Sequence, residues 1–234
     1  MGYLYETHMH TSQVSGCAVA TAARQVRSFK EKGYAGIIVT DHFVNGYSTC
    51  PQHLSWEDKM KHLMSGYAEA RIEGDKCGLD VFFGWEFTYR GSDFLTYGLG
   101  PDFLAAHPNL DRLPIEEYSE VVRNNGGYLA QAHPYRDDWY VEYRFPVDHW
   151  LIDGVEIYNS SEPEARNAKA LAFAKLHGLP MQSGSDCHGR SALFPAGVML
   201  SDKADSIFDI IEAIKSRQAV LITPDSDRGP QGSQ

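Results

Sequence analysis

The chain alternates between hydrophobic patterns typical of helices and short apolar runs typical of buried strands. Before Gly33, apolar residues recur at helical spacing, at Val19, Ala22, Val26 and Phe29. A run rich in β-branched residues follows at 35–40 and predicts a buried strand. The same alternation predicts helices at 55–78, 114–126, 163–177 and 205–216, and strands at 81–84, 94–98, 128–132, 154–158, 181–183, 198–200 and 219–222.

This alternation predicts an α/β fold in which βα units surround a largely parallel sheet. About seven or eight such units are enough to close a barrel, and 234 residues suit a barrel of one domain. No linker or change of composition divides the chain. We therefore expect a single domain over residues 1–224 and a disordered tail at 225–234.

Composition and charge restrict the class of protein. The hydrophobic fraction of 43% and the charged fraction of 22% are those of an ordinary globular protein. The 21 basic and 31 acidic residues give a net charge of -10, which argues against a general affinity for nucleic acid or anionic membranes. A phosphate could still bind locally, because bound metal ions would be the largest charges in such a site.

The cysteines and the N-terminal sequence predict the compartment. The four cysteines form no C-x-x-C pair, so neither a zinc finger nor a disulfide framework is indicated. The first residues, MGYLYETHMH, lack the features of a signal peptide, and no apolar run approaches the about 18 residues of a membrane span. We therefore expect a cytoplasmic protein with no membrane partner.

Histidine and carboxylate side chains follow the predicted strands. His8 and His10 end the first strand, and residues two apart in a strand project to the same face, so both imidazoles can reach one ion. Asp186 and His188 repeat this spacing near the other end of the chain. Three more strands are followed by Asp41 and His42, by Glu86 and by His133. Each residue alone could have an ordinary structural role, but their recurrence at strand ends, where barrel active sites are built, favours a metal site.

Other polar residues have weaker assignments. Glu156 could be an interior carboxylate whose hydrogen bonds are all made within the barrel, or it could orient a metal ligand without binding the ion itself. Arg136 and Arg190 follow His133 and His188 closely, so each could bind phosphate oxygens, although a structural salt bridge explains them equally well. The remaining histidines are expected to be surface or packing residues: His53, His62, His107, His149 and His177.

The ordered set H-x-H, T-D-H, strand-end Glu, A-H-P, G-x-E-x-Y-N and S-D-x-H resembles the PHP (polymerase and histidinol phosphatase) family over residues 3–222. The resemblance implies a distorted, TIM-like (β/α)7 barrel that holds two or three divalent ions, zinc, manganese or iron. It also implies the ligands: His8, His10, Glu86 and Asp186 for one ion, Glu86 and His133 for a second, and His42 and His188 for a third.

The chain departs from the family pattern at two positions. The loop after His10 reads TSQVSGC where relatives usually have Asp or His, and Leu95 stands where many relatives have His. The candidates to supply the missing ligands are Asp93, Gln13, Ser15, Cys17 and a water molecule.

These residues predict a metal-dependent hydrolase that cleaves a small phosphorylated substrate, a phosphomonoester or a phosphodiester, through a metal-activated hydroxide. Glu86, Asp186 and His188 are the expected catalytic residues. Mixed imidazole and carboxylate ligands suit zinc, manganese or iron better than calcium.

Two alternatives to this function stay open. One is an amidohydrolase-type enzyme that cleaves C–N bonds, a class that often carries a carboxylated lysine on a middle strand. None of Lys59, Lys61 and Lys76 lies at a predicted strand end, which disfavours this class. The other alternative is a noncatalytic metal-binding PHP module.

Overall fold

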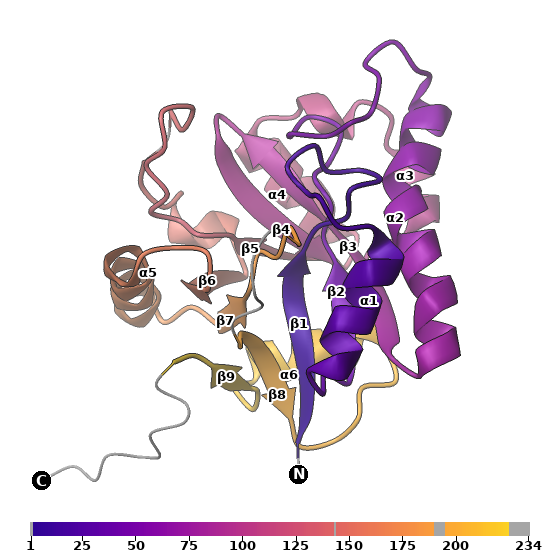
Figure 1. Ribbon diagram of the computed structural model, residues 1–234. Coiled ribbons are helices and arrows are strands. Elements are labelled where there is room, and N and C mark those ends of the chain that lie inside the picture. Colours follow the sequence, from indigo (N-terminus) through magenta and orange to yellow (C-terminus); the bar gives the residue numbers. More distant parts are fainter. Residues whose placement is uncertain (1, 143, 190–194, 225–234) are drawn as a thin grey trace, which may run out of the picture.

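The computed structural model (Figure 1) describes residues 2–142, 144–189 and 195–224, and the predicted tail at 225–234 lies outside them. The strands are β1 (Tyr3–Met9), β2 (Gly36–Val39), β3 (Asp80–Tyr89), β4 (Ser92–Tyr97), β5 (Tyr128–Gln131), β6 (Gly154–Asn159), β7 (Met181–Gly184), β8 (Gly197–Leu200) and β9 (Val220–Ile222). The helices are α1 (Ala22–Glu31), α2 (Trp56–Cys77), α3 (Pro101–Ala106), α4 (Ile115–Asn124), α5 (Glu164–His177) and α6 (Ile207–Lys215), with 3-10 turns at Leu110–Arg112 and His149–Leu151.

The described strands form one mixed sheet in the order β7-β6-β5-β4-β3-β2-β1-β8-β9, which curls into a nearly closed barrel. The first strand meets the segment after β7, where the His10 amide donates to the Cys187 carbonyl (3.0 Å) and the Cys187 amide to the His8 carbonyl (3.3 Å). Inside the barrel, the Tyr97 hydroxyl on β4 bonds the Thr7 carbonyl and the Gln182 amide on the opposite wall. The predicted fold class, a barrel-like α/β fold in one domain, is confirmed.

Two strands depart from the expected parallel arrangement: β8 runs antiparallel to β1 and β9, and β4 is reversed as well. β4 runs antiparallel to β3 and to β5, whereas β1–β3 and β5–β7 pair in parallel. The reason is the two-residue turn at Arg90 and Gly91, which have φ values of 50° and 79°. Two residues can connect only antiparallel strands, because a parallel crossover needs a dozen or more.

The helices cover the outside of the barrel, with α1 and α2 beside β1–β3 and α5 beside β6 (Figure 1). The predicted periodicity of α1 is confirmed, since Ala22, Val26 and Phe29 are fully buried. Val19 precedes the helix and is 53% exposed, because the Thr21 side chain caps the first turn by accepting from the Arg24 amide. Within the described ranges, none of the helices is both long and apolar enough to cross a membrane.

Candidate metal centre

Four buried side chains converge at the end of the barrel where β1 and β7 meet. Nε2 of His8 lies 3.1 Å from Oε1 of Glu86 and 3.4 Å from Oδ1 of Asp186. Nε2 of His10 lies 3.2 Å from the same oxygen of Asp186 and 3.4 Å from Oε2 of Glu86. The fold thus brings together two imidazoles and two carboxylates that are almost 180 residues apart at the extremes of the sequence.

Glu86 also faces two further imidazoles. Its Oε2 lies 2.9 Å from Nδ1 of His42, and its Oε1 lies 3.3 Å from Nε2 of His133. Asp93 is one of the candidates for a missing metal ligand. Its Oδ2 lies 3.9 Å from Nε2 of His133, so Asp93 is near the site. Leu95 is instead fully buried in the hydrophobic core.

Among the described residues, four sets of side chains place one possible ligand atom each within 4.8 Å of the others. They are His8, His133 and Asp186; His8, His10 and Glu86; His42, Glu86 and Asp93; and His10, Cys17, His42 and His188. Each predicted metal ligand except Asp41 belongs to at least one set.

The protonation of the two N-terminal histidines makes this centre suitable for a cation. Nδ1 of His8 lies 2.9 Å from a carboxylate oxygen of Glu156, and Nδ1 of His10 lies 3.0 Å from the Ser15 hydroxyl. If these partners fix the proton on each Nδ1, both Nε2 atoms carry lone pairs, and they lie only 3.2 Å apart. Nearby, Nδ1 of His42 and Oε2 of Glu86 are buried and make no hydrogen bond. Lone pairs and carboxylates that face one another fit a divalent ion.

Protons compete with a cation for these atoms. Burial lowers the pKa of His8, but the surrounding carboxylates, Asp186 first, outweigh it and hold that pKa well above its usual value. Burial and the neighbouring His188 lower the pKa of His10 to about 3. A metal ion would displace the proton on Nε2 of His8, so metal binding should release protons and weaken at low pH.

Asp41 does not join the other predicted ligands. Its oxygens accept from the Thr11 amide (2.6 Å), the Thr11 hydroxyl (2.6 Å) and the Ser15 hydroxyl (2.7 Å). Ser15 in turn accepts from His10, so Asp41 holds the hydroxyl that orients His10. The structure therefore favours a positioning role over the predicted metal ligation, because the carboxylate is already occupied.

Glu156 lies behind two of the histidines. Besides the contact with His8, it accepts the His133 amide (3.1 Å) and the Asn159 side-chain amide (2.9 Å) through Oε2. This geometry agrees with the interpretation that Glu156 orients a ligand rather than binding the ion. Such partners fix the tautomer and the ring orientation of a histidine ligand.

Comparisons with known proteins agree with the family resemblance. A family model described as PHP-associated matches residues 164–219. The fold resembles a two-domain protein from Bacteroides vulgatus described as containing a predicted PHP-like metal-dependent phosphoesterase, with a TM-score of 0.70 and 16% identity. The match and the likeness of fold support the resemblance to the PHP family. The comparison covers 95% of this chain and 65% of the Bacteroides protein.

Other proteins with a similar fold have different described activities. An amidohydrolase from Chromobacterium violaceum with bound sulfate has a TM-score of 0.55 and 15% identity, over 96% of this chain and 99% of its own. A lesion-specific endonuclease from Pyrococcus furiosus has a TM-score of 0.60 and 14% identity, over 94% of this chain and 58% of its own. No curated protein sequence matches the chain. At these identities the likeness establishes the fold and leaves the substrate open.

The structure describes one of the two arginines predicted to bind phosphate, Arg136. Arg136 donates through Nη2 to Asp186 (2.8 Å) and through Nε to Glu162 (2.6 Å). These ion pairs are the structural alternative considered for it, and its binding of substrate stays a prediction. Arg190, the other predicted phosphate ligand, lies outside the described residues.

Sequence reasoning overlooked Glu6. This fully buried carboxylate accepts hydrogen bonds from three backbone amides through Oε1, those of Thr7 (3.0 Å), His8 (2.8 Å) and Ser185 (2.9 Å). The β1 register shifts between Glu6 and Met9, which leaves amides without regular partners. Glu6 therefore connects β1 to the segment after β7 and fixes the backbone of His8. A charged residue inside an otherwise buried strand was the available signal.

Proposed function

We propose that the chain is a metal-dependent phosphoesterase that hydrolyses a small phosphorylated substrate. The observation that carries the proposal is the centre formed by His8, His10, Glu86 and Asp186, in which the two imidazole Nε2 atoms lie 3.2 Å apart. His8, His10, Glu86 and Asp186 would hold one ion, and Glu86, His133 and Asp93 offer ligands for a second. When bound, such ions supply a nucleophile from water near neutral pH and neutralise charge on phosphoryl oxygens.

The residues of the chain prepare this centre before any substrate arrives. Glu156 keeps the proton of His8 on Nδ1, and the Asp41–Ser15 pair does the same for His10. Both Nε2 atoms therefore point to the centre, where that of His10 is an acceptor and that of His8 becomes one when its proton leaves. The ligating side chains of β1 and β3 are buried, so bulk water does not screen the charges that act on the substrate. We retain Glu86, Asp186 and His188 as the proposed catalytic residues.

A phosphate-like substrate is also consistent with the sulfate described for the Chromobacterium protein, since sulfate has the tetrahedral shape of phosphate. The same protein is described as an amidohydrolase, which keeps C–N cleavage as the alternative. This chain lacks one feature that is common in amidohydrolases, because none of the strands β1–β9 contains a lysine that could be carboxylated.

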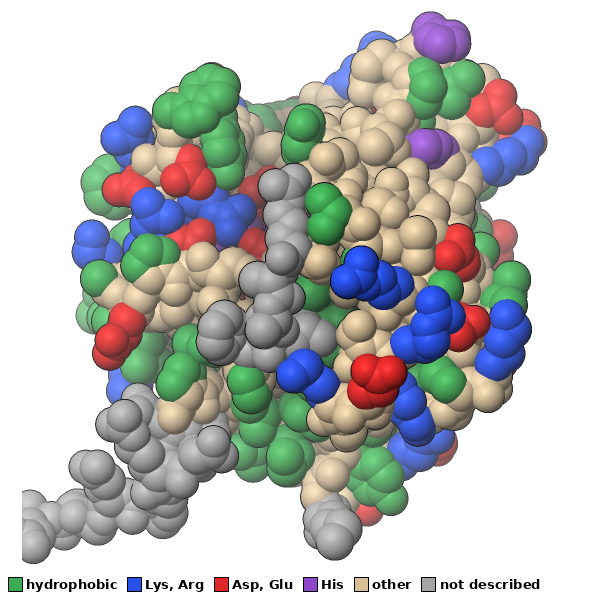
Figure 2. All heavy atoms as spheres, in the orientation of Figure 1, with side chains coloured by type: hydrophobic (Ala, Val, Ile, Leu, Met, Phe, Trp, Pro, Cys, Tyr) green, Lys and Arg blue, Asp and Glu red, His purple; other side chains and the backbone are tan. Residues whose placement is uncertain are grey.

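A nucleic-acid substrate, as the Pyrococcus endonuclease suggests, receives little support from charge. On the face shown in Figure 2, Lys and Arg side chains are interspersed with Asp and Glu instead of forming a continuous basic surface. Together with the net charge of -10, this favours a small substrate.

The proposal can be tested with metal-free protein reloaded with Mn²⁺ or Zn²⁺ and offered phosphomonoesters, phosphodiesters and amides. We expect turnover of a phosphoester that is lost on chelation and restored by metal. Turnover of amides alone would indicate the amidohydrolase alternative. Stoichiometric metal without turnover of any substrate class would indicate a noncatalytic module.

Replacing Arg136 with Ala distinguishes a role in supporting the metal ligand Asp186 from a role in binding substrate. Since Arg136 pairs with Oδ2 of Asp186, while Oδ1 faces His8 and His10, we expect metal affinity to fall about 10- to 100-fold and KM at saturating metal to stay unchanged. Equilibrium dialysis and steady-state kinetics measure the two quantities separately. Intact metal affinity with a raised KM would assign Arg136 to the substrate instead.

A further inference from the structure

The loop between β1 and α1 carries Cys17 to the edge of the metal centre. Two backbone hydrogen bonds fix this loop on either side of the cysteine. The Gly16 amide donates to the Tyr47 carbonyl (2.8 Å), and the Val19 amide donates to the His188 carbonyl (2.9 Å). Cys17 is thus held between the segment that follows β2 and the segment that follows β7.

A glycine allows the second of these contacts. Gly189 has a φ of +74°, and a Cβ at this position would lie 2.2 Å from Cβ of Ala20. No side chain fits there, and the backbone conformation itself favours glycine. The absence of a side chain lets residues 188 and 189 pack directly on the loop, which brings the His188 imidazole to the thiol of Cys17.

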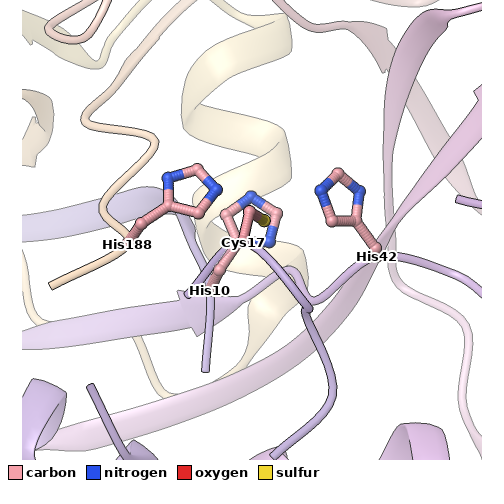
Figure 3. A group of neighbouring side chains, drawn as sticks. All are labelled: His10, Cys17, His42 and His188. Atoms are coloured by element: carbon pink, nitrogen blue, oxygen red, sulfur yellow. The ribbon is translucent and has the colours of Figure 1, made fainter. Parts of the chain in front are cut away.

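Figure 3 shows the sulfur of Cys17 between the imidazoles of His188 and His42, with His10 beside it. The ligand atoms of these four residues lie within 4.8 Å of one another. His10 is committed elsewhere, because its Nδ1 bonds Ser15 and its Nε2 faces Asp186 and Glu86. Cys17, His42 and His188 remain for a separate ion.

The two outer imidazoles have the protonation that metal binding needs. Nδ1 of His188 lies 2.7 Å from the Asp186 carbonyl, which can only accept, so Nε2 of His188 carries the lone pair. Nδ1 of His42 pairs with Oε2 of Glu86 at 2.9 Å. With its proton on Nδ1, His42 also has its Nε2 lone pair available to a cation.

The family resemblance implies a third ion at His42 and His188, and we propose that the Cys17 thiolate is the further ligand that completes its site beside the carboxylate-rich centre. The sulfur ligand gives the two regions different preferences: a thiolate with two imidazoles favours Zn²⁺ or Co²⁺, whereas carboxylate-rich ligands also accept Mn²⁺. Three protein ligands leave one position open, as in catalytic zinc sites. The proposal concerns metal binding and does not depend on which bond the protein hydrolyses.

The test uses Co²⁺, because a cobalt–thiolate bond produces a near-ultraviolet charge-transfer band that imidazole and carboxylate ligands do not. We expect metal-free wild-type protein titrated with Co²⁺ to develop this band and Cys17→Ser to lack it while still binding Co²⁺ at the other ligands. Cys77→Ser, at the end of α2, is the matched control and should keep the band. A band that persists in Cys17→Ser, or its absence from the Co²⁺-loaded wild type, would overturn the proposal.

A second measurement needs no variant and so does not depend on the folding of one. Zn²⁺ should protect Cys17 of the wild type from iodoacetamide, and a chelator should restore labelling, as read by peptide mass spectrometry. Equal labelling of Cys17 with and without Zn²⁺ would contradict ligation by the thiolate.

Discussion

Replacing Glu86 with Gln is expected to lower kcat/KM for a phosphoester by about 10³-fold, which corresponds to about 4 kcal/mol of lost stabilisation. Glu86 contacts imidazoles at the ends of three strands, β1, β2 and β5: its two oxygens reach His8, His10, His42 and His133 within 3.4 Å. Glutamine has nearly the same shape but no charge, and its amide would direct hydrogens at nitrogen lone pairs. We therefore expect metal content to fall together with activity.

The measurement pairs elemental analysis with steady-state kinetics at a fixed free-metal concentration. Glu57→Gln on the surface of α2 removes the same charge far from the centre and should behave as wild type. A Glu86→Gln protein that retains full metal content and activity within tenfold of wild type would remove Glu86 from the proposed machinery.

Replacing Glu6 with Ala should have the largest effect on stability. Three buried amides would lose their acceptor, and unsatisfied buried donors cost about 1–3 kcal/mol each, so we expect unfolding free energy to fall by about 3 kcal/mol or more. Glu6→Gln keeps an acceptor oxygen and places its amide where Oε2 now lies buried without a hydrogen bond. Its cost should be much smaller, and urea denaturation measures both.

The stability difference between wild type and Glu6→Gln should depend on pH. Burial raises the pKa of Glu6 from 4.5 to about 7, so the folded state binds the proton more tightly than the unfolded state. The resulting stabilisation is complete below the unfolded pKa and is lost as pH rises through about 7. Wild type should therefore lose stability relative to Glu6→Gln between pH 5 and pH 8. A constant difference over this range would mean that Glu6 stays ionised in the folded protein.

The sequence located most of the centre because βα units impose a simple geometry. A residue that follows a buried parallel strand must lie at one end of the barrel, so His8, His42, His133 and Asp186 could be placed together without knowledge of the loops. The same rule could not distinguish Asp41 from His42. Adjacent residues at a strand end point in different directions, and only the hydrogen bonds from Thr11 and Ser15 show where the carboxylate lies.

The remaining features depend on the path of the backbone between elements. Five candidates were open for the ligands that the chain lacks, and hydrophobic periodicity does not say which side chain of a loop faces inward. The anchors at Gly16 and Val19 select Cys17, and the hairpin at Arg90 and Gly91 carries Asp93 to His133. The bulge at Glu6 is equally invisible to a period-two pattern, which assumes an uninterrupted strand.

The barrel closes where the first strand meets the chain after β7, and His8, His10, Asp186 and His188 lie on the two sides of that seam. An ion held there would connect two segments that lie almost 180 residues apart in the sequence. The centre cannot assemble until both segments have come together, so we expect metal binding to follow barrel closure. Metal occupancy is then a reporter of completed folding, and chelation should first loosen the seam.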